Sequence, residues 1–332
     1  MKKVLLFILV FITTMFVIPI LFLNRKILSV GADESVSLPL EELSIEQHDY
    51  SKYSTIKLLH KKTEEVEEVN LDEYVANVVS AEMPVKYDIE ALKAQAMAAR
   101  TYTIYKITNS KKHSEADICD DSTCCQAWIS KEDRIKKWND SEANDNWNKI
   151  VKAVNETRGK IITYNSKPIN AFFHSNSGGK TEIPLYVWGG EGYPYLQIIE
   201  TSGEDNYSQY KSEAEFIKEE FEEKIKDKHS NFEIDYNEEN CISILERDDS
   251  NRVRTVKIGN LNLSGVEVRT LLGLKSANFE VEIFEDKIKF TVIGYGHGVG
   301  MSQTGADSLA KQGKNYEEII KHFYKGVEIT DM

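Results

Sequence analysis

An uncharged apolar run near the N-terminus constrains the fold of this chain more than any other feature. It covers residues 4–23, follows two lysines and ends before an Asn-Arg-Lys segment. About 20 consecutive apolar residues span a bilayer as a helix, whereas a cleaved secretory signal has an apolar region of about 7 to 15. The run therefore predicts an uncleaved single transmembrane helix within an anchor over residues 1–26, although cleavage after Ala32 stays open.

The remainder of the chain is expected to work outside the cytoplasm. Residues 27–55 are polar and acidic and lack a sustained helix or strand period, so they predict an extracytoplasmic tether. One folded domain is expected over residues 56–332, since a chain with 41% hydrophobic residues can bury a substantial core. A net charge of -13 provides no broad basic surface, which argues against nucleic acid as a partner.

Hydrophobic periods and turn residues predict an α+β fold, with mixed helices and short antiparallel strands around a substrate groove. Helix spacing covers residues 71–80, and Asp88 is a suitable N-cap for the alanine-rich helix that follows. A further helix is expected over the charged segment 212–229. Turn residues between strand-like runs predict four hairpins, which lie within residues 54–71 and at 165–168, 248–251 and 285–287.

The segment VVSAEMPV places Glu82 between the apolar end of a predicted helix and Pro84. A carboxylate at a helix C-terminus faces the negative end of the helix dipole, and apolar neighbours remove part of its water. Both effects favour the protonated acid, which suits a general acid catalyst. The alternative is a surface glutamate beside a proline turn.

A polar block, FFHSNSGGKTE, follows a predicted strand. Its glycines let backbone amides approach a ligand, and its side chains can bond sugar hydroxyl or acetamido groups. A hydrophilic hairpin end is the alternative, and a Ser-His nucleophile is disfavoured because neighbours in a strand point to opposite faces. The predicted substrate-binding residues in this block are His174, Ser175, Asn176, Ser177, Gly178 and Gly179.

A second glycine-rich block, GYGHGVGMSQTGADSLAKQG, covers residues 294–313, and its alternate glycines lead into a predicted helix. Its turn can offer backbone N–H groups to an anionic or carbonyl oxygen, with side-chain donors from His297, Ser302 and Gln303. The pattern matches neither GxGxxG nor the P-loop, so it does not support a nucleotide site. Tight packing of a glycine turn is the alternative.

Several other side chains suit a sugar groove or a charged ligand. Arg100 can orient Glu82 or bind a carboxylate, with a structural ion pair as the alternative. Aromatic and amide groups suit carbohydrate, but aromatic residues more often pack in a core. The candidates of this kind are Tyr102, Gln126, Tyr164, Tyr193 and Tyr195.

Four blocks in this order resemble the stage II sporulation protein D (SpoIID) family, which also includes amidase enhancer proteins. The blocks are LDEYVANVVSAEMPVKYDIEALKAQAMAARTYT, CDDSTCCQAW, FFHSNSGGKTE and GYGHGVGMSQTGADSLAKQGKNYEEIIKHFYKGVEI. The resemblance runs from about residue 56 to the end of the chain. It is specific because the blocks occur together and in order, although each block alone is not.

The resemblance implies a peptidoglycan lytic transglycosylase, anchored in the membrane of a spore-forming bacterium and active during engulfment. The catalytic glutamate of the family lies in the AEMP motif, which is Glu82 here. This residue would protonate the glycosidic oxygen between N-acetylmuramic acid and N-acetylglucosamine in peptide-stripped glycan. As a carboxylate it would then deprotonate the muramoyl C6 hydroxyl, which closes on C1 and gives a 1,6-anhydro sugar.

The cysteines predict zinc, a disulfide or free thiols. His113, Cys119 and Cys125 offer imidazole and thiolate ligands at loop-compatible spacing, and a water, a substrate group or a nearby side chain would complete a tetrahedron. An extracytoplasmic location also permits a disulfide. The family block makes Cys119 and Cys125 the better matched pair, with Cys124 as an extra member. Structural zinc is favoured over a Cys119–Cys125 disulfide, and the proposed chemistry requires no cofactor.

Two further functions stay open. A wall-binding domain can activate an amidase without cleaving glycan, as the amidase enhancer branch implies, and a zinc ion with an open position can activate water in a wall hydrolase. The resemblance also implies partners, namely stage II sporulation protein P, an amidase and endopeptidase, and the membrane protein stage II sporulation protein M. The catalytic domain would lie outside the mother-cell membrane, facing the septal intermembrane space.

Overall fold

A computed structural model of the chain describes residues 49–109 and 112–332. The predicted anchor and most of the predicted tether therefore lie outside the described residues. None of the helices in the described part combines the length and apolar character that a membrane span requires. The described chain opens with a buried Tyr50 and a 3-10 turn, Ser51–Tyr53, before the first strand.

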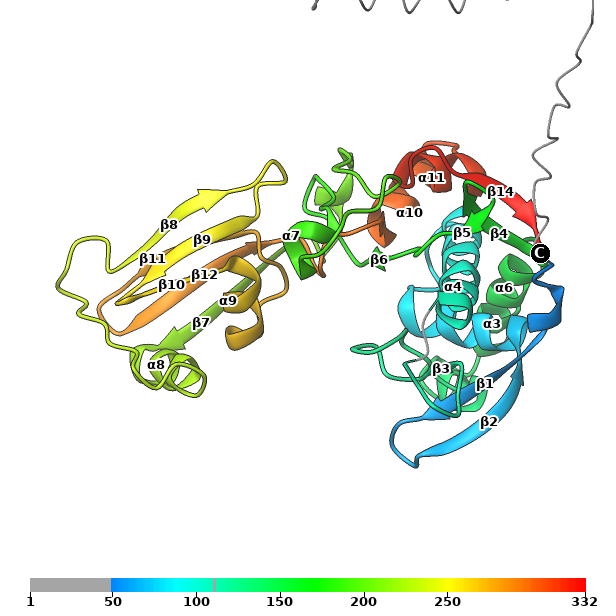
Figure 1. Ribbon diagram of the computed structural model, residues 1–332, viewed down its shortest axis with the longest axis horizontal. Helices are drawn as coiled ribbons and strands as arrows, with labels where there is room; N and C mark the ends of the chain where they lie inside the picture. Colours follow the sequence, from blue (N-terminus) through cyan, green and yellow to red (C-terminus); the bar gives the residue numbers. More distant parts are fainter. Residues whose placement is uncertain (1–48, 110–111) are drawn as a thin grey trace, which may run out of the picture. The chain divides into compact units, whose positions relative to one another are not determined.

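The described residues form a mixed α+β fold with short, mostly antiparallel sheets, as the sequence predicted (Figure 1). They contain two separate hydrophobic cores. The first core belongs to a helical region, residues 49–210 and 294–332, and the second to a β-rich region, residues 211–293. The helices of the helical region are α3 (Leu71–Glu82), α4 (Ile89–Asn109), α5 (Lys131–Ile135), α6 (Ala143–Asn155), α7 (Pro184–Trp188), α10 (Gln303–Lys311) and α11 (Tyr316–Phe323).

Helix α4 lies at the centre of the helical region and packs against α3, α6, α10, α11 and β4. Its alanines are buried, which lets several helices approach it closely. A larger side chain at Ala96 or Ala98 would overpack this core, at a cost of about 1–3 kcal/mol. As the sequence predicted, Asp88 caps the helix, since its carboxylate accepts the Glu90 N–H at 2.9 Å.

Short strands surround these helices. Strand β1 pairs with β2 in a hairpin and with β3 in parallel, and β4 pairs antiparallel with β5 and β14. The predicted turn at 165–168 is present, because Asn165 and Ser166 adopt positive φ between β4 and β5. The strands are β1 (Thr55–His60), β2 (Glu65–Asn70), β3 (Ile118–Cys119), β4 (Lys160–Tyr164), β5 (Lys167–Pro168), β6 (Phe173–His174), β13 (Met301–Ser302) and β14 (Glu328–Asp331).

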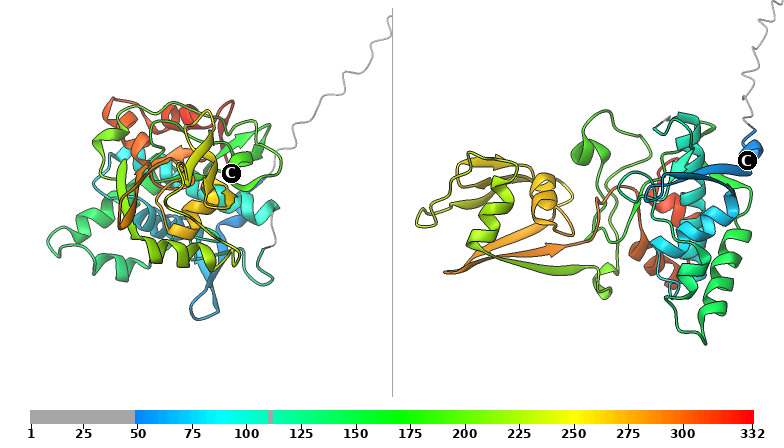
Figure 2. Two further views of the ribbon diagram at one scale, coloured as in Figure 1. Left: turned by 90° about the vertical axis from the view of Figure 1, so that its left-hand side faces the viewer. Right: turned by 90° about the horizontal axis from the view of Figure 1, so that it is seen from below.

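The β-rich region contains two three-stranded antiparallel sheets and two helices. The sheet orders are β10-β9-β8 and β11-β12-β7. The chain enters this region through β7 and leaves it through β12, and these two strands pair along their length (Figure 2). The elements are β7 (Lys211–Ile217), α8 (Lys218–Lys226), β8 (Ile242–Arg247), β9 (Val253–Ile258), β10 (Leu261–Leu263), α9 (Gly265–Leu272), β11 (Phe279–Ile283) and β12 (Lys287–Ile293).

The predicted helix over residues 212–229 is wrong in its first part. Residues Lys211–Ile217 form strand β7, and the helix begins only at Lys218. The segment SEAEF alternates small or apolar residues with glutamates, which is a strand period, and pairing with β12 buries Phe216. The charged stretch that follows is helical, and both predicted hairpins of this region, at 248–251 and 285–287, are present.

Candidate active site

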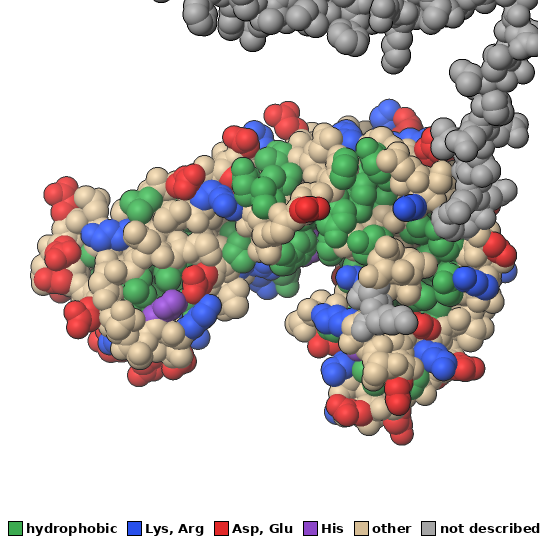
Figure 3. All heavy atoms as spheres, in the orientation of Figure 1, with side chains coloured by type: hydrophobic (Ala, Val, Ile, Leu, Met, Phe, Trp, Pro, Cys, Tyr) green, Lys and Arg blue, Asp and Glu red, His purple; other side chains and the backbone are tan. Residues whose placement is uncertain are grey.

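A cavity of about 620 Å³ is lined by residues of both regions. Its wall includes Glu82 at the end of α3, His174 in β6 and Arg269 in α9. The space-filling view shows the described surface hollowed between the helical and β-rich regions, with hydrophobic side chains gathered above the hollow (Figure 3). The volume lies within the usual range for a ligand site.

The structure brings only part of the predicted site to this cavity. Glu82, His174, His297 and Cys125 line it, together with Tyr102 and Gln126 from the wider set of groove candidates. The predicted site residues that are absent from its lining are His113, Cys119, Ser175, Asn176, Ser177, Gly178, Gly179, Ser302 and Gln303.

Glu82 is the last residue of α3 because the chain turns extended immediately afterwards. The residue before a proline avoids the helical conformation, and Met83, which precedes Pro84, has φ -124° and ψ 136°. The Glu82 side chain is half-buried and its Oε1 accepts the N–H of Ala127 at 2.7 Å. The helix end predicted from sequence therefore delivers this carboxyl group to the cavity.

Burial raises the pKa of Glu82 above that of an ordinary glutamate. Hydrogen bonds from the Ala127 amide and from the side chain of Gln303 oppose this effect, because they favour the ionised form. The net direction is upward, so the protonated acid persists to higher pH than in a solvated glutamate. Such a group can donate a proton at a pH where a solvated glutamate is ionised, and it can accept one after ionisation.

Two neutral imidazoles lie next to each other in the cavity wall, with ring centroids 5.7 Å apart. Burial lowers the pKa of His174 to about 3 and holds the pKa of His297 well below its usual range. The Val299 amide donates to Nδ1 of His297 at 3.0 Å, which places the ring proton of His297 on Nε2. His174 bonds the Val299 carbonyl through Nδ1, and its Nε2 has no hydrogen-bond partner among the described residues.

The glycine turn at 294–300 serves packing. The amides of Gly294 and Gly296 donate to the carbonyls of Tyr210 and Lys275, so they are not free to bind a ligand. Gly300 has φ +75°, and a Cβ there would lie 2.0 Å from the Phe172 carbonyl oxygen. These contacts favour the packing alternative for Gly294, Gly296 and Gly300, and the binding of a ligand oxygen by the turn stays a prediction.

Glu204, which the sequence did not single out, organises both polar blocks. Its carboxylate is 1% exposed and accepts hydrogen bonds from the Ser177 hydroxyl at 2.6 Å and from the hydroxyl of Ser302. The Gly179 amide at 3.0 Å and the Thr201 hydroxyl at 2.6 Å also donate to it. One buried acid thus joins Ser177 and Ser302, which are more than a hundred residues apart in the sequence. No local sequence pattern predicts this role.

This network explains why several predicted substrate-binding residues do not reach the cavity. Asn176, Ser177 and Ser302 are buried, and their side chains bond Glu204 or Thr304. Gly178 has φ +70°, and a Cβ there would meet Ile293 at 2.9 Å. These residues therefore hold the loops of the site in position, and their contact with sugar stays a prediction.

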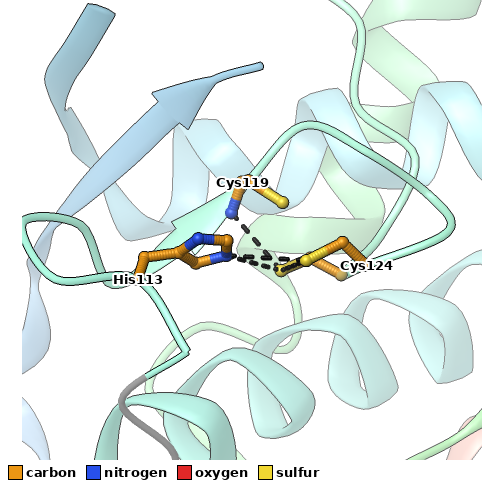
Figure 4. A group of neighbouring side chains, drawn as sticks. His113, Cys119 and Cys124 are labelled. Carbon is orange, nitrogen blue, oxygen red and sulfur yellow. Dashed lines mark hydrogen bonds between the residues drawn. The ribbon is translucent and has the colours of Figure 1, made fainter. Parts of the chain in front are cut away.

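The described residues contain one group of histidine and cysteine ligands suited to a metal. His113, Cys119, Cys124 and Cys125 place one donor atom each within 4.8 Å of one another (Figure 4). His113 Nε2 lies 3.7 Å from Cys124 Sγ and 3.5 Å from Cys125 Sγ, and the two sulfurs are 3.8 Å apart. All four cysteines of the chain are free thiols in the structure.

These separations fit tetrahedral zinc. Zn–S bonds of about 2.3 Å and Zn–N bonds of about 2.0–2.1 Å require edges of about 3.8 Å between sulfurs and about 3.5 Å between nitrogen and sulfur. Cys124, which the sequence treated as an extra member, supplies a fourth donor atom. The set Cys3His is one that structural zinc sites use.

Arg100 has a structural role, as the alternative interpretation had it. Its side chain is fully buried and bonds Asp72 at 2.9 Å and the Thr157 carbonyl at 2.9 Å. Tyr164 and Tyr195 line a different cavity, so they do not join Tyr102 and Gln126 near Glu82. Their spacing in the sequence carried no information about which cavity each would face.

Several cavity residues were not predicted, and three of them carry chemistry of interest. Lys106 comes from α4, Trp188 ends α7, and Arg269 belongs to α9 of the β-rich region. Trp188 lies with its ring centroid 4.8 Å from that of Phe172 and 5.0 Å from that of His297. Only tertiary contacts bring these residues together, although an isolated tryptophan before two glycines was a signal that could have been weighed.

Comparison with known proteins identifies the family. The sequence profile of the SpoIID family, described as "Stage II sporulation protein", matches residues 59–164. Stage II sporulation protein D of Bacillus amyloliquefaciens is 38% identical over 268 residues, covering 80% of this chain and 76% of that protein. The chain belongs to the SpoIID family. The family resemblance inferred from the four sequence blocks is thus confirmed.

Two further relatives support the assignment to the SpoIID family. Stage II sporulation protein D of Bacillus subtilis is 36% identical over 279 residues, which is 83% of this chain and 79% of that protein. The Amidase enhancer of the same species is 31% identical over 306 residues, with 76% of this chain and 40% of that protein covered. The SpoIID profile match contains Glu82 and the whole His/Cys cluster, but neither glycine-rich block.

Proposed function

We propose that this SpoIID family member is a peptidoglycan lytic transglycosylase. The observation that carries the proposal is Glu82, a half-buried acid with a raised pKa at the wall of a 620 Å³ cavity. Among the described residues that line this cavity, Glu82 is the only carboxylic acid. The substrate is the bond between N-acetylmuramic acid and N-acetylglucosamine in glycan strands from which the peptides have been removed.

In the first step, protonated Glu82 donates its proton to the glycosidic oxygen as the bond to muramoyl C1 breaks. Burial of Glu82 favours this step, because it keeps the acid protonated at a pH where a solvated glutamate is ionised. The Ala127 amide then stabilises the resulting carboxylate through its 2.7 Å hydrogen bond.

In the second step, the Glu82 carboxylate accepts the proton of the muramoyl C6 hydroxyl, whose oxygen bonds to C1. The product is a 1,6-anhydro sugar, and no water is consumed. A hydrolase with an Asp/Glu pair needs a second carboxyl group to act as nucleophile or to activate water. A cavity lined by one acid fits a reaction in which the sugar supplies its own nucleophile.

The His/Cys cluster supports the same carboxyl group through the chain that it holds. His113, Cys119, Cys124 and Cys125 would bind zinc, which supplies a structural cross-link when bound. Ala127, the donor to Glu82, lies two residues beyond Cys125. Four protein ligands leave no open position for water, which disfavours a zinc-dependent wall hydrolase.

We further propose that the chain is held at the cell membrane by its N-terminal run, with the described residues facing the septal intermembrane space. Stage II sporulation proteins P and M are the proposed partners, the first because it removes peptides and so prepares the glycan. These assignments follow from the family and from residues 4–23, and they are separate from the argument on Glu82.

Digestion of peptide-free glycan by the full chain tests the proposal. Mass spectrometry should detect 1,6-anhydromuramoyl ends with the wild-type protein and none with Glu82→Gln, which cannot transfer a proton. Anhydro products from Glu82→Gln at the wild-type rate would refute it.

The match to an Amidase enhancer supports a second candidate, a wall-binding domain that activates an amidase. The two functions separate in one experiment, in which the chain acts on peptide-free glycan with no amidase present. Cleavage supports the transglycosylase. Stimulation of an added amidase on intact peptidoglycan, with no cleavage of the stripped strands, supports the activator.

A further inference from the structure

Arg269 lies in the cavity wall without an acidic partner. It belongs to α9, whose N-terminus is capped by the Ser264 hydroxyl, and it reaches the cavity from the β-rich region. No carboxylate oxygen of a described residue lies within 4.0 Å of its guanidinium nitrogens. By contrast, Arg247 of the same region pairs with Glu280 at 2.5 Å, and Arg254 donates to the Tyr186 carbonyl at 3.2 Å.

Arg269 also lines a small second cavity with Glu182 and Asp248, whose carboxylates accept hydrogen bonds from the Ser250 hydroxyl and form no ion pair with the guanidinium. Tyr295, His174, His297 and Arg252 interact with the charge of Arg269. Burial keeps both imidazoles uncharged, and Arg252 is itself a buried cation that bonds the carbonyls of the polar block. A partly buried guanidinium has lost part of its solvation, and no carboxylate of a described residue pairs with it within 4.0 Å.

A second cation, Lys106, lines the same cavity from α4. Its ammonium lies 5.0 Å from the centroid of the Tyr102 ring and within 4.0 Å of no carboxylate oxygen among the described residues. Cys124 and Cys125 of the His/Cys cluster line the same cavity. The described lining of the cavity thus combines two cations, Arg269 and Lys106, with one carboxylic acid, Glu82, in a chain whose net charge is -13.

Such a charge distribution favours an anionic ligand at this place. In peptidoglycan, the lactyl group of each muramic acid ends in an amide while the stem peptide is attached, and in a free carboxylate once it is removed. A guanidinium binds a carboxylate through two parallel N–H···O bonds, a geometry that an amide cannot match.

We propose that Arg269, assisted by Lys106, binds the free lactyl carboxylate of peptide-stripped glycan and so makes the cavity selective for stripped over peptide-bearing strands. This proposal rests on the proposed function, because it assumes that glycan occupies the cavity beside Glu82. Because the cavity would recognise the charge of the lactyl carboxylate, the reaction that removes the peptide also creates the group that Arg269 binds. The class of reaction that must supply this substrate is hydrolysis of the amide between lactyl group and peptide.

The test measures binding separately from cleavage. The full chain carrying Glu82→Gln is titrated with peptide-free glycan strands, either with free carboxylates or after their conversion to neutral methylamides. We expect about tenfold weaker binding of the methylamide strands, since a hydrogen-bonded charged pair is worth about 1.5–3 kcal/mol and 1.4 kcal/mol is tenfold. Arg269→Gln should weaken binding of the free-acid strands about tenfold and leave the methylamide strands unaffected.

Matched variants complete the design. Arg269→Lys keeps the charge and should restore part of the preference for free-acid strands. Lys321→Gln removes one positive charge from an exposed position of α11 that does not line the cavity, and it should change neither affinity. Equal melting temperatures among the variants show that the fold is retained.

Three results would overturn the proposal. Equal binding of free-acid and methylamide strands by the chain that retains Arg269 would mean that the cavity does not prefer the carboxylate. Equal weakening of both glycans by Arg269→Gln means that the guanidinium contacts a sugar oxygen. Displacement of glycan by poly-glutamate at equal carboxylate concentration means a general anion site. Cleavage of glycan by Glu82→Gln would instead refute the proposed function and leave this binding comparison intact.

Discussion

The backbone amide of Ala127 donates a 2.7 Å hydrogen bond to the carboxyl group of Glu82. The two residues are far apart in the sequence, and the donor lies two residues after Cys125 of the His/Cys cluster. The Ala127 amide therefore contributes to both the position and the electrostatic environment of the candidate catalytic acid.

The pH dependence of cleavage should report the raised pKa of Glu82. The reaction needs the protonated acid, so the rate falls as pH rises through the folded-state pKa, which lies above that of an ordinary glutamate. A rate profile of kcat/KM against pH measures this limb. A descending limb at the ordinary pKa of glutamate, about 4.3, would contradict the burial argument.

The stability of the fold should also depend on the raised pKa of Glu82, even when no substrate is present. The folded protein favours protonated Glu82, so its contribution is intact below the unfolded pKa and is lost as pH rises through the raised folded value. Glu82→Gln removes this loss of stability at high pH, because glutamine does not ionise. Its melting temperature relative to wild type should therefore increase from pH 4 to pH 8, and a constant difference across that range would contradict the prediction.

Metal analysis should find about one zinc per chain, since four donor atoms lie within 4.8 Å of one another and the separations among His113, Cys124 and Cys125 match tetrahedral edges. Chelation should lower the melting temperature, because a structural metal stabilises the fold that contains its ligands. Cys124→Ser should lower zinc affinity if Cys124 is the fourth ligand. Cys241→Ala is the control, because Cys241 lies buried in the second core, and it should leave the metal content unchanged. A Cys119–Cys125 disulfide with no metal in freshly purified protein would refute the zinc assignment.

Glu204→Gln should lower the free energy of unfolding by about 3 kcal/mol, because an amide would place an N–H group among the donors that now share the carboxylate. Chemical denaturation measures the change. Glu191→Gln makes the same substitution at an exposed position and should have an effect within about 0.5 kcal/mol. Equal effects of the two variants would mean that the network contributes little.

A second buried acid should make stability depend on pH near neutrality. Burial, together with a hydrogen bond to Asp248, raises the pKa of Glu182 to about 7. Its protonated form favours the fold, so this contribution is greatest below the unfolded pKa and is lost as pH rises through about 7. Melting temperatures between pH 5 and 8 should fall less for Glu182→Gln than for wild type, and parallel curves would disprove the assignment.

Local patterns were sufficient for most elements of the fold. Helix spacing and the Asp88 cap predicted α3 and α4, and turn residues predicted the hairpins, because these features depend on neighbours along the chain. The segment 212–229 misled the prediction, since its glutamates suit a solvated helix as well as an exposed strand face. Pairing with β12 decided in favour of a strand.

In the candidate site as well, local patterns predicted some features, and contacts between distant segments decided others. Glu82 could be predicted because a helix end, apolar neighbours and a proline occur within a few residues of it. Ser177 and Ser302 were assigned to substrate because polar blocks beside glycines resemble ligand loops. They turn out to bond Glu204, a residue whose own surroundings in the sequence are unremarkable in composition.

By itself, the sequence determined the family, the α+β class, the acid at the end of α3 and the histidine and cysteines of the cluster. Each of these depends on residue type and short spacing. Tertiary structure alone decided which polar side chains are buried, that Cys124 joins the cluster, and that Arg269 faces the cavity of Glu82. The physical reason is that burial, charge pairing and pKa depend on contacts between segments far apart in the chain, which no local pattern records.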